Sequence, residues 1–257
     1  MIYIGVPVHD ERHTAGVLLW RIRQVMLEED LDFRLLVVDD ASTDGTDEVL
    51  EPYRRVLPLD VFRHGRRQGY AASVERLVRE ALARSDYHRR DGLLTLQADF
   101  TDAPEAIPEM IRRFQSGADL VAGALREPRD LPRSVQLGRR AASWLARSLP
   151  VPDEAEDPLS GFRFYRLFVL RRALEELEDA DDRLLHYDGW AANAELLTRV
   201  WPHVRQFDQV EYAADYRKRY RDTRFRLFQQ LWDVFRAGRD ERLRGKLAGL
   251  EAGGGSS

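Results

Sequence analysis

The sequence predicts an α/β fold in which a mostly parallel β-sheet is flanked by helices. Short apolar, β-branched runs alternate along the chain with segments of helical periodicity. In addition, polar and largely acidic clusters follow directly after three of the predicted strands. Alternating strands and helices are typical of parallel sheets with right-handed crossover connections. The chain has 257 residues, 44% of them hydrophobic, which suits one large domain of this kind.

The first half of the chain shows the clearest alternation. Ile2 to Val8 is an apolar run that predicts a buried parallel strand, and Thr14 to Glu29 has apolar residues at helical spacing. A second strand is predicted over Phe33 to Val38, followed by turn and cap formers that open a helix near Asp47. The next predicted elements are a strand over Leu59 to Arg63, a helix over Tyr70 to Ala83, a strand over Leu93 to Ala98 and a fifth strand over Leu120 to Ala122.

The second half predicts mainly helices. Arg126 to Asp157 is an Arg- and Pro-rich loop with a helix around Val135 to Leu149, and two further helices are expected, over Arg166 to Glu178 and within Leu185 to Val200. After Asp215 comes a basic helix whose apolar face carries Phe225, Phe228, Leu231, Trp232 and Phe235. We therefore expect one domain over residues 1–212, a basic aromatic helical extension over 213–250 and a disordered Gly/Ser tail over 251–257.

Composition excludes several classes of function. The formal net charge of -4 gives no argument for a nucleic-acid partner. The chain has no cysteine, which excludes disulfides, thiolate nucleophiles and zinc–sulfur sites. The N-terminus has no signal-peptide pattern, and no apolar stretch approaches the ~20 residues that span a bilayer. The expected location is the cytoplasm.

The polar clusters predict a ligand site. They are His9-Asp10-Glu11, Asp39-Asp40 and Asp99-Phe100-Thr101-Asp102, and each stands at the end of a predicted strand. In parallel sheets, ligands bind beyond the carboxyl ends of the strands. A carboxylate there can accept a hydrogen bond from a base or a ribose, or bind a cation that bridges a pyrophosphate. Helix capping after the second strand and an ordinary turn after the fourth are the structural alternatives.

A fourth segment, Asp157 to Arg163, combines a turn-forming Asp-Pro, a glycine that permits close approach and an arginine suited to phosphate. A simple loop would have the same composition. None of these segments identifies an activity by itself.

The order and spacing of four motifs resemble family 2 glycosyltransferases, which have the Rossmann-like GT-A fold, and among them the polyprenyl-phosphate sugar synthases. Val6 to Glu11 is similar to the family's P-x-x-N-E opening, and Val37 to Thr46 is a near-complete match to V-V-D-D-x-S-x-D-G-T. Gln97 to Glu105 is similar to D-A-D-L-x-x-x-P-E, and Asp157 to Arg163 is similar to D-P-x-S-G-F-R. Together the motifs cover about residues 1 to 175.

The resemblance implies a donor site for a UDP- or GDP-sugar with Mg²⁺ or Mn²⁺. Asp99 would be the metal-binding carboxylate. Gln97 stands where the family has the first Asp of its metal motif, so one negative charge is lost and the metal requirement is left open. Arg66 or Arg67 could then offset part of the pyrophosphate charge. The residues expected to bind the donor are Pro7, Glu11, Asp39, Asp40, Arg67, Gln97, Ala98 and Asp99.

The resemblance also implies transfer with inversion of the anomeric centre. Arg163, together with Arg126 and Arg139 or Arg140, would hold an acceptor phosphate or the sugar diphosphate. A hydroxyl acceptor would need a general base, whereas a lipid phosphate is already ionised. The first choice for that base is Asp188 and the second is Glu195, with helix capping as the structural alternative for Asp188.

The expected function is therefore an inverting transfer to a polyprenyl phosphate or a cell-envelope glycan. The basic segment Tyr216 to Arg226 and the apolar face after it could place the extension on the inner face of the membrane, or the helix could pack on its own domain. A non-catalytic sugar-nucleotide binder is one alternative function. A sugar-nucleotide pyrophosphorylase is another, although the G-x-G-T-R-x-x-P-x-x-K start of that class is missing near the first strand.

Overall fold

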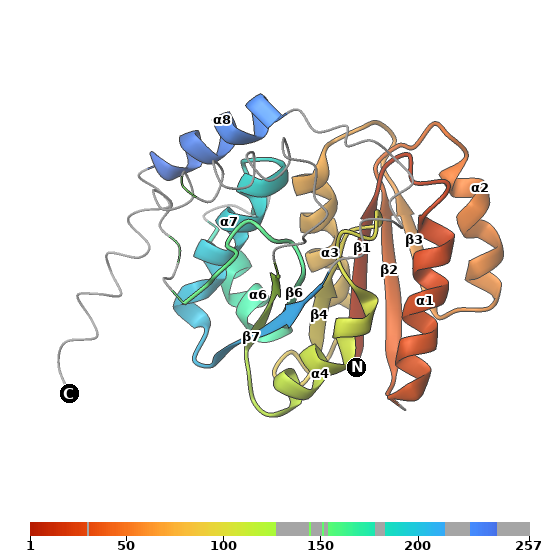
Figure 1. Ribbon diagram of the computed structural model, residues 1–257, viewed down its shortest axis with the longest axis horizontal. Coiled ribbons are helices and arrows are strands. Elements are labelled where there is room, and N and C mark those ends of the chain that lie inside the picture. Colours follow the sequence, from red (N-terminus) through yellow and green to blue (C-terminus); the bar gives the residue numbers. More distant parts are fainter. Residues whose placement is uncertain are drawn as a thin grey trace.

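A computed structural model describes residues 1–29, 31–126, 144, 151, 154–177, 183–213 and 227–240. Within this part of the chain, seven strands form one sheet in the order β3-β2-β1-β4-β6-β5-β7 (Figure 1). The strands are β1 (Ile2–Val8), β2 (Phe33–Asp39), β3 (Leu59–Arg63), β4 (Gly92–Thr95), β5 (Leu120–Leu125), β6 (Arg163–Arg166) and β7 (Phe207–Tyr212).

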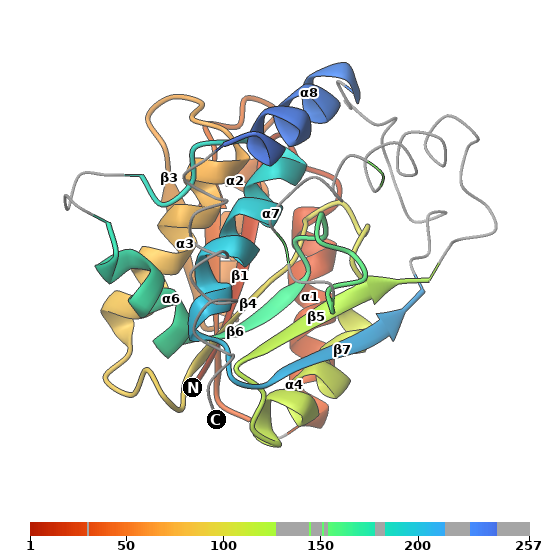
Figure 2. The same cartoon turned by 90° about the vertical axis from the view of Figure 1, so that its left-hand side faces the viewer.

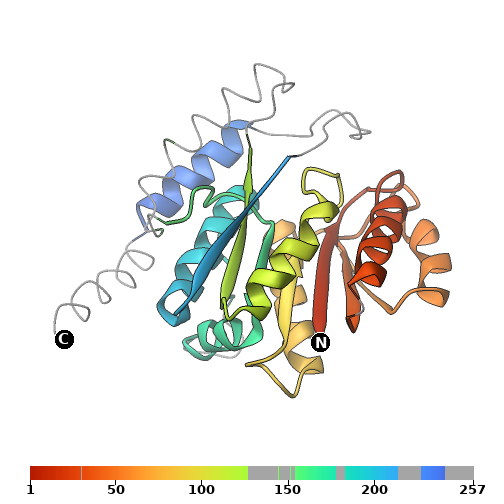
Figure 3. The same ribbon diagram turned by 60° about the horizontal axis from the view of Figure 1, so that its bottom comes forward.

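Helices cover both faces of the sheet (Figures 2 and 3). The helices α1 (Ala15–Glu28) and α4 (Ile107–Gln115) pack on one face. On the opposite face lie α3 (Tyr70–Arg84), α6 (Leu167–Glu175) and α7 (Gly189–Val200). The short helix α2 (Thr46–Leu50) and the 3-10 turn after it (Glu51–Arg55) follow β2, and two more 3-10 turns cover Pro104–Ala106 and Trp201–His203.

The two-residue period of β1 shows how the core is divided between the faces. Ile4 and Val6 contribute to the cluster under α1 and α4, whereas Tyr3 contributes to the cluster under α3 and α6. Successive side chains of a strand point to opposite faces, so a strand covered by helices on both sides must be apolar throughout. This arrangement confirms the predicted α/β class.

The sheet is mixed rather than purely parallel. The strands β3, β2, β1 and β4 are parallel, but β6 runs antiparallel between β4 and β5, and β7 is parallel to β5. The fifth predicted strand exists, although β6 separates it from β4. Neither β6 nor β7 was predicted, because the four residues Arg-Phe-Tyr-Arg of β6 have no apolar run and the expected helix began at Arg166.

The C-terminal helix α8 (Leu227–Gly238) packs on α7 through a small apolar contact (Figure 1). Its Val234 and Ala237 are buried against Ala191 and Ala194 of α7. Trp232, in contrast, is 60% exposed. The predicted apolar face was therefore wrong for Trp232, which points away from the domain. Among the described residues, no helix has the length and apolar character that a membrane crossing requires.

Several predictions fall outside the described residues. These are the helix around 135–149 apart from residue 144, the basic segment 216–226 and the Gly/Ser tail. The division into a domain and an extension at residues 212 and 213 stays a prediction.

Candidate functional site

The carboxyl ends of β1, β2 and β4 meet at one edge of the sheet. β1 lies between β2 and β4, so the chain order reverses at β1. In open α/β sheets such a reversal opens a crevice beyond the strand ends, because the connections leave in opposite directions. The three acidic clusters of the sequence follow these three strands.

Pro7 is accommodated because β4 ends early. Gly5 accepts a hydrogen bond from Leu96 on the β4 side, and Val8 accepts one from Asp40 on the β2 side. Alternation along the strand directs the nitrogen of Pro7 toward β4, whose pairing with β1 stops at Gly5. A proline that lacks its N–H therefore breaks no bond of the ladder. Pro7 lies half-buried near the end of β1, and its contact with a donor stays a prediction.

Asp39 is fully buried at the end of β2, with 0% exposure. Its Oδ1 accepts a hydrogen bond from the backbone N–H of Ser42 at 2.9 Å. Its Oδ2 has no hydrogen-bond donor among the described residues, and the nearest cationic atom is the Arg63 Nε at 3.5 Å. A buried carboxylate oxygen without a hydrogen bond is costly, so this atom is a ready acceptor for an N–H or O–H of a ligand.

Asp40 has a different role. Its carboxylate accepts hydrogen bonds from His64 Nδ1 at 2.8 Å, from the Gln68 N–H at 2.7 Å and from the Gly69 N–H at 2.8 Å. Both oxygens are thus engaged and the residue is buried. The Asp40 side chain fixes the 64–69 loop, and its contact with a donor stays a prediction.

Asp10 has a left-handed backbone with φ of 54°. Its Oδ1 accepts a hydrogen bond from the Thr43 N–H at 2.8 Å, and its own N–H donates to Ser42 Oγ at 2.9 Å. Asn and Asp adopt left-handed backbone more readily than most residues, and an Asn side chain has the same Oδ1 acceptor. Asp therefore preserves the local geometry at a motif position where Asn is usual.

Glu11 lies half-buried just before α1. Its Oε2 accepts a hydrogen bond from the Thr14 hydroxyl at 2.5 Å, and its N–H donates to Thr46 Oγ1 at 2.9 Å. The bond to Thr46 joins the loop after β1 to the first residue of α2, whereas the bond from Thr14 is local. Glu11 is therefore held at this edge of the sheet by both segments.

Each of the three strand-end loops contains one non-glycine residue with positive φ. Besides Asp10, these are Ala41 at 55° and Phe100 at 60°. Such conformations cost free energy and persist where the surroundings impose them, which is most common at functional sites. The strain supports the assignment of this edge as the site.

The 97–102 loop follows β4 and carries the predicted metal-binding residue. Gln97 and Asp99 are half-buried and Ala98 is buried. Asp99 Oδ1 accepts a hydrogen bond from the Thr101 N–H at 3.0 Å, and Asp102 Oδ2 accepts one from the Gln97 N–H at 2.8 Å. Burial, together with the neighbouring charge of Asp99, raises the pKa of Asp102 to about 7.

The opposite border of the crevice carries Arg66 and Arg67, both exposed on the 64–69 loop. Within the described ranges, neither guanidinium has a hydrogen bond or an ion pair to another side chain. A guanidinium that is not engaged by the protein can bind a phosphate with its parallel N–H groups. The geometry is compatible with the predicted role of Arg67.

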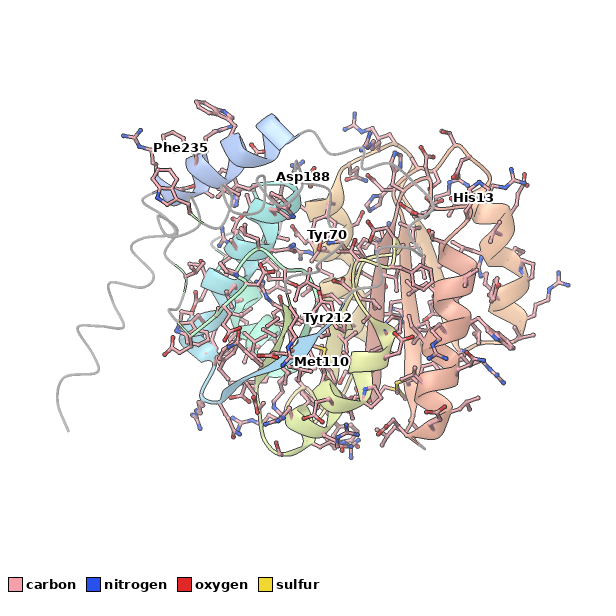
Figure 4. The ribbon with its side chains drawn as sticks, in the orientation of Figure 1. His13, Tyr70, Met110, Asp188, Tyr212 and Phe235 are labelled. Atoms are coloured by element: carbon pink, nitrogen blue, oxygen red, sulfur yellow. The ribbon has the colours of Figure 1, made fainter. Side chains whose placement is uncertain are left out.

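Asp188 joins two helices at this edge (Figure 4). Its backbone forms the N-cap of α7, while its Oδ1 accepts a hydrogen bond from the Ala71 N–H in the first turn of α3, at 2.9 Å. Its Oδ2 lies 2.9 Å from the place where a Cβ on Gly69 would stand. The carboxylate is exposed, so it can meet a substrate, and its use as a base stays a prediction.

The sequence profile described as "Glycosyl transferase family 2" matches residues 3–177. The chain belongs to this family. The profile begins in β1 and ends after α6, so it covers the parallel strands β3, β2, β1 and β4 together with β5 and β6. The resemblance inferred from the four motifs is confirmed.

Two curated relatives add detail to this family 2 assignment. A dolichol-phosphate mannosyltransferase of Pyrococcus furiosus is 28% identical over 180 residues, which are 68% of this chain and 47% of that protein. An undecaprenyl-phosphate mannosyltransferase of Micrococcus luteus is 28% identical over 170 residues, 65% of this chain and 66% of that protein. The chain thus matches about half of the first relative and just under two thirds of the second.

Among solved structures, the glucosyl-3-phosphoglycerate synthase of Mycobacterium tuberculosis, in complex with Mn²⁺, UDP-glucose and phosphoglyceric acid, has the same fold. Its TM-score is 0.66 at 19% identity, and the match covers 96% of this chain and 80% of that one. The GT-A architecture predicted for a family 2 member is thereby confirmed.

Arg163, the last residue of the fourth family motif, does not face the crevice. It is 1% exposed and donates hydrogen bonds to the backbone oxygens of Asn193 at 2.5 Å and Pro158 at 2.7 Å. Its Nε has no hydrogen bond in the described part of the chain. The prediction that Arg163 contacts an acceptor phosphate or the sugar diphosphate is therefore wrong: the residue holds the 157–161 loop against α7.

Glu195 is likewise an internal structural residue. It is 1% exposed, and it accepts hydrogen bonds from the backbone N–H groups of His186 and Tyr187 and from the guanidinium of Arg199. A carboxylate with these partners cannot reach an acceptor hydroxyl. The prediction of Glu195 as the second choice of general base is therefore wrong. Of the other arginines, Arg126 is exposed and pairs with Glu211, whereas Arg139 and Arg140 lie outside the described residues.

The described residues do not form a closed metal site. No group of three His, Cys, Asp or Glu side chains among them is arranged to hold an ion. Asp99 is the half-buried carboxylate of the 97–102 loop, and both oxygens of Asp102 have protein partners. Mg²⁺ is commonly bound by one or two carboxylates plus substrate phosphates. The residues present therefore fit a cation that binds together with a diphosphate.

The sequence did not single out Tyr212 or the partners of Asp102. Tyr212 is the last residue of β7 and its hydroxyl donates to Asp102 Oδ1 at 3.0 Å. Asp102 stood in the third polar cluster, but a partner 110 positions away along the chain leaves no local signal.

Proposed function

We propose that this family 2 member transfers a sugar, with inversion of the anomeric centre, from a UDP- or GDP-sugar to a polyprenyl phosphate. The observation that carries the proposal is the buried Oδ2 of Asp39, which accepts no hydrogen bond from the described residues, at the same edge of the sheet as the loop of Asp99. An acceptor atom at a strand end and a carboxylate suited to a diphosphate-bound cation are what a nucleoside diphosphate needs.

The donor would lie across the ends of β1, β2 and β4. Asp39 Oδ2 would accept a hydrogen bond from the base or the ribose, with Pro7 and Glu11 beside it. Asp99 would hold Mg²⁺ or Mn²⁺, which when bound would neutralise charge on the leaving diphosphate. Gln97 and Ala98 belong to the same loop as Asp99 and would contact the donor there. Arg67 would reach the diphosphate from the 64–69 loop.

The names of the two relatives support a polyprenyl-phosphate acceptor, since both are sugar transferases of polyprenyl phosphates. A phosphate acceptor is ionised at neutral pH and attacks without a general base. A hydroxyl of a cell-envelope glycan would instead require Asp188 to accept its proton. Asp188 is exposed where α3 and α7 meet, so either acceptor could approach it.

Contact with the membrane belongs to the same proposal. Exposed Trp232 on α8 stacks on Phe235, with ring centroids 5.7 Å apart, and Arg239 lies over the Phe235 ring. An aromatic face beside cationic side chains binds the interface of an anionic membrane. This would place the enzyme at the inner face of the membrane, where a lipid phosphate is presented.

The test is a donor screen with undecaprenyl phosphate in anionic vesicles. We expect release of UDP or GDP from one donor of the panel, dependent on the lipid, with Mn²⁺ present or absent. A variant D188N should keep its turnover with the lipid phosphate and lose most of it with a hydroxyl acceptor. Binding of a nucleotide sugar without any turnover would instead indicate the non-catalytic alternative, and nucleotide exchange with pyrophosphate would indicate a pyrophosphorylase.

A further inference from the structure

The 97–102 loop is bound to a distant strand. Asp102 Oδ1 accepts a hydrogen bond from the hydroxyl of Tyr212, at the end of β7. In the sheet, β6 and β5 lie between β4, which the loop follows, and β7. Asp102 and Tyr212 are both buried, with 2% and 6% exposure, so water competes little for this bond.

The loop needs such support because its backbone is strained. Phe100 has φ of 60°, a conformation that costs an L-amino acid roughly 1–2 kcal/mol. Two hydrogen bonds oppose this cost from within the loop, Thr101 N–H to Asp99 and Gln97 N–H to Asp102. The hydrogen bond from Tyr212, in contrast to these two, comes from another element, the strand β7.

Packing supports this segment on one side and leaves it open on another. Phe100 and Ala103 contact the apolar cluster under α1 and α4. A cavity of about 330 Å³ lies between this segment and the end of β7, and Phe100, Asp102 and Tyr212 are among its lining residues. Where no side chain fills the space, close packing cannot fix the loop. On this side the hydrogen bond between Asp102 and Tyr212, two residues of the cavity wall, ties the loop to β7.

Tyr212 is itself rigidly placed. Its ring packs edge-on against Phe162 with centroids 5.1 Å apart, and its backbone oxygen accepts a hydrogen bond from the Arg126 N–H at 2.9 Å. Phe162 lies between the 157–161 segment and β6, and it is fully buried. A donor fixed in this way can hold the 97–102 loop (Tyr212 is labelled in Figure 4).

We propose that Tyr212 and Asp102 are positioning residues that hold the 97–102 loop, and with it Asp99, in the conformation that binds the donor. This inference rests on the proposed function and adds two residues to it. Neither side chain needs to touch the donor. The role requires a hydrogen bond between them but no negative charge on Asp102, because an Asn there could accept from the Gln97 N–H and donate to the Tyr212 oxygen.

The test compares four variants of the full chain. Y212F removes the hydroxyl alone, D102A removes both bonds, and D102N can keep both. The matched control is Y3F, because the Tyr3 hydroxyl donates to the Arg84 backbone oxygen at 3.0 Å at the opposite end of the sheet. All four are measured by amide hydrogen exchange of residues 97–102 and by steady-state kinetics with the donor and Mn²⁺.

We expect Y212F and D102A to exchange these amides about tenfold faster than the wild type, and to raise the donor KM by about tenfold with kcat within about threefold. D102N and Y3F should match the wild type in both measurements. Equal exchange in Y212F and Y3F would overturn the proposal, as would faster exchange without a change in donor KM. If the wild type binds no nucleoside diphosphate, the proposed function fails, and the exchange data alone then show whether the Tyr212 bond holds the loop.

Discussion

At the scale of single residues, the two adjacent aspartates after β2 have different surroundings. Asp40 is satisfied by His64 and two backbone N–H groups, whereas Asp39 keeps one buried oxygen without a hydrogen bond. The sequence predicts that both aspartates bind the donor, because they belong to one motif. The distribution of donors around them separates a structural carboxylate from one that can accept a ligand.

Replacing Asp39 tests this difference. D39N keeps an Oδ1 for the Ser42 N–H but puts an amide N–H in the place of Oδ2. We expect nucleotide affinity, measured by calorimetry, to fall about tenfold to a hundredfold, as for loss of a hydrogen bond to a charged group. The matched control is D47N, since Asp47 is exposed and pairs with the same Arg63. Similar affinities for both variants would contradict the ligand role of Asp39.

Arg163 differs from Asp39, because its motif predicted contact with a phosphate but its side chain is buried inside the domain. R163M leaves the backbone oxygens of Pro158 and Asn193 without their charged donor. We expect the free energy of unfolding, measured with denaturant, to fall by about 3 kcal/mol. R171M, at an exposed position on α6, should change it by less than about 0.5 kcal/mol. A stable R163M with a selectively raised KM for the acceptor would restore the phosphate role.

At the scale of elements, the start of α3 is the joint that brings the two halves of the site together. Asp40 binds the Gly69 N–H and Asp188 binds the Ala71 N–H, so carboxylates from two distant segments satisfy the first turn of one helix. The unpaired N–H groups and the dipole at a helix N-terminus favour such negative charges. This contact places the candidate base next to the 64–69 loop.

Gly69 is required at this joint for two physical reasons. Its φ of 98° and ψ of 170° lie in a region that is essentially restricted to glycine, and a Cβ would stand 2.9 Å from Asp188 Oδ2. We expect G69A to lower the free energy of unfolding by about 2–3 kcal/mol and to displace Asp188. The control G65A lies in the same loop, where a Cβ meets no atom within 4 Å, and should be neutral. Equal stability of the two variants would refute this account.

At the scale of the whole molecule, the buried Asp102 couples stability to pH. Burial raises its pKa to about 7 in the folded chain, whereas the unfolded chain retains a value near 3.8. Between these values the folded state binds the proton more tightly, so stability falls as the pH rises from about 4 to about 7. Above the folded pKa the buried negative charge is present in full.

A comparison with D102N isolates this contribution, because the amide does not titrate. We expect the wild type to lose stability relative to D102N over that pH window, by an amount on the order of a few kcal/mol. Denaturant unfolding of both proteins at pH 4, 5.5, 7 and 8 measures the difference. A difference that stays constant from pH 4 to pH 8 would show that the Asp102 carboxyl is not perturbed.

The local features of this protein could be predicted from short stretches of its sequence. The apolar runs gave the strands β1 to β4 and the helices between them, and the turn-forming clusters at their ends located the crevice, because both signals are contained in short segments. The strand β6 and the contacts of Arg163, Glu195 and Asp102 were decided only in the tertiary structure. Burial and hydrogen-bond partners depend on residues far away in the chain, such as Tyr212 for Asp102, and a local pattern carries no record of them.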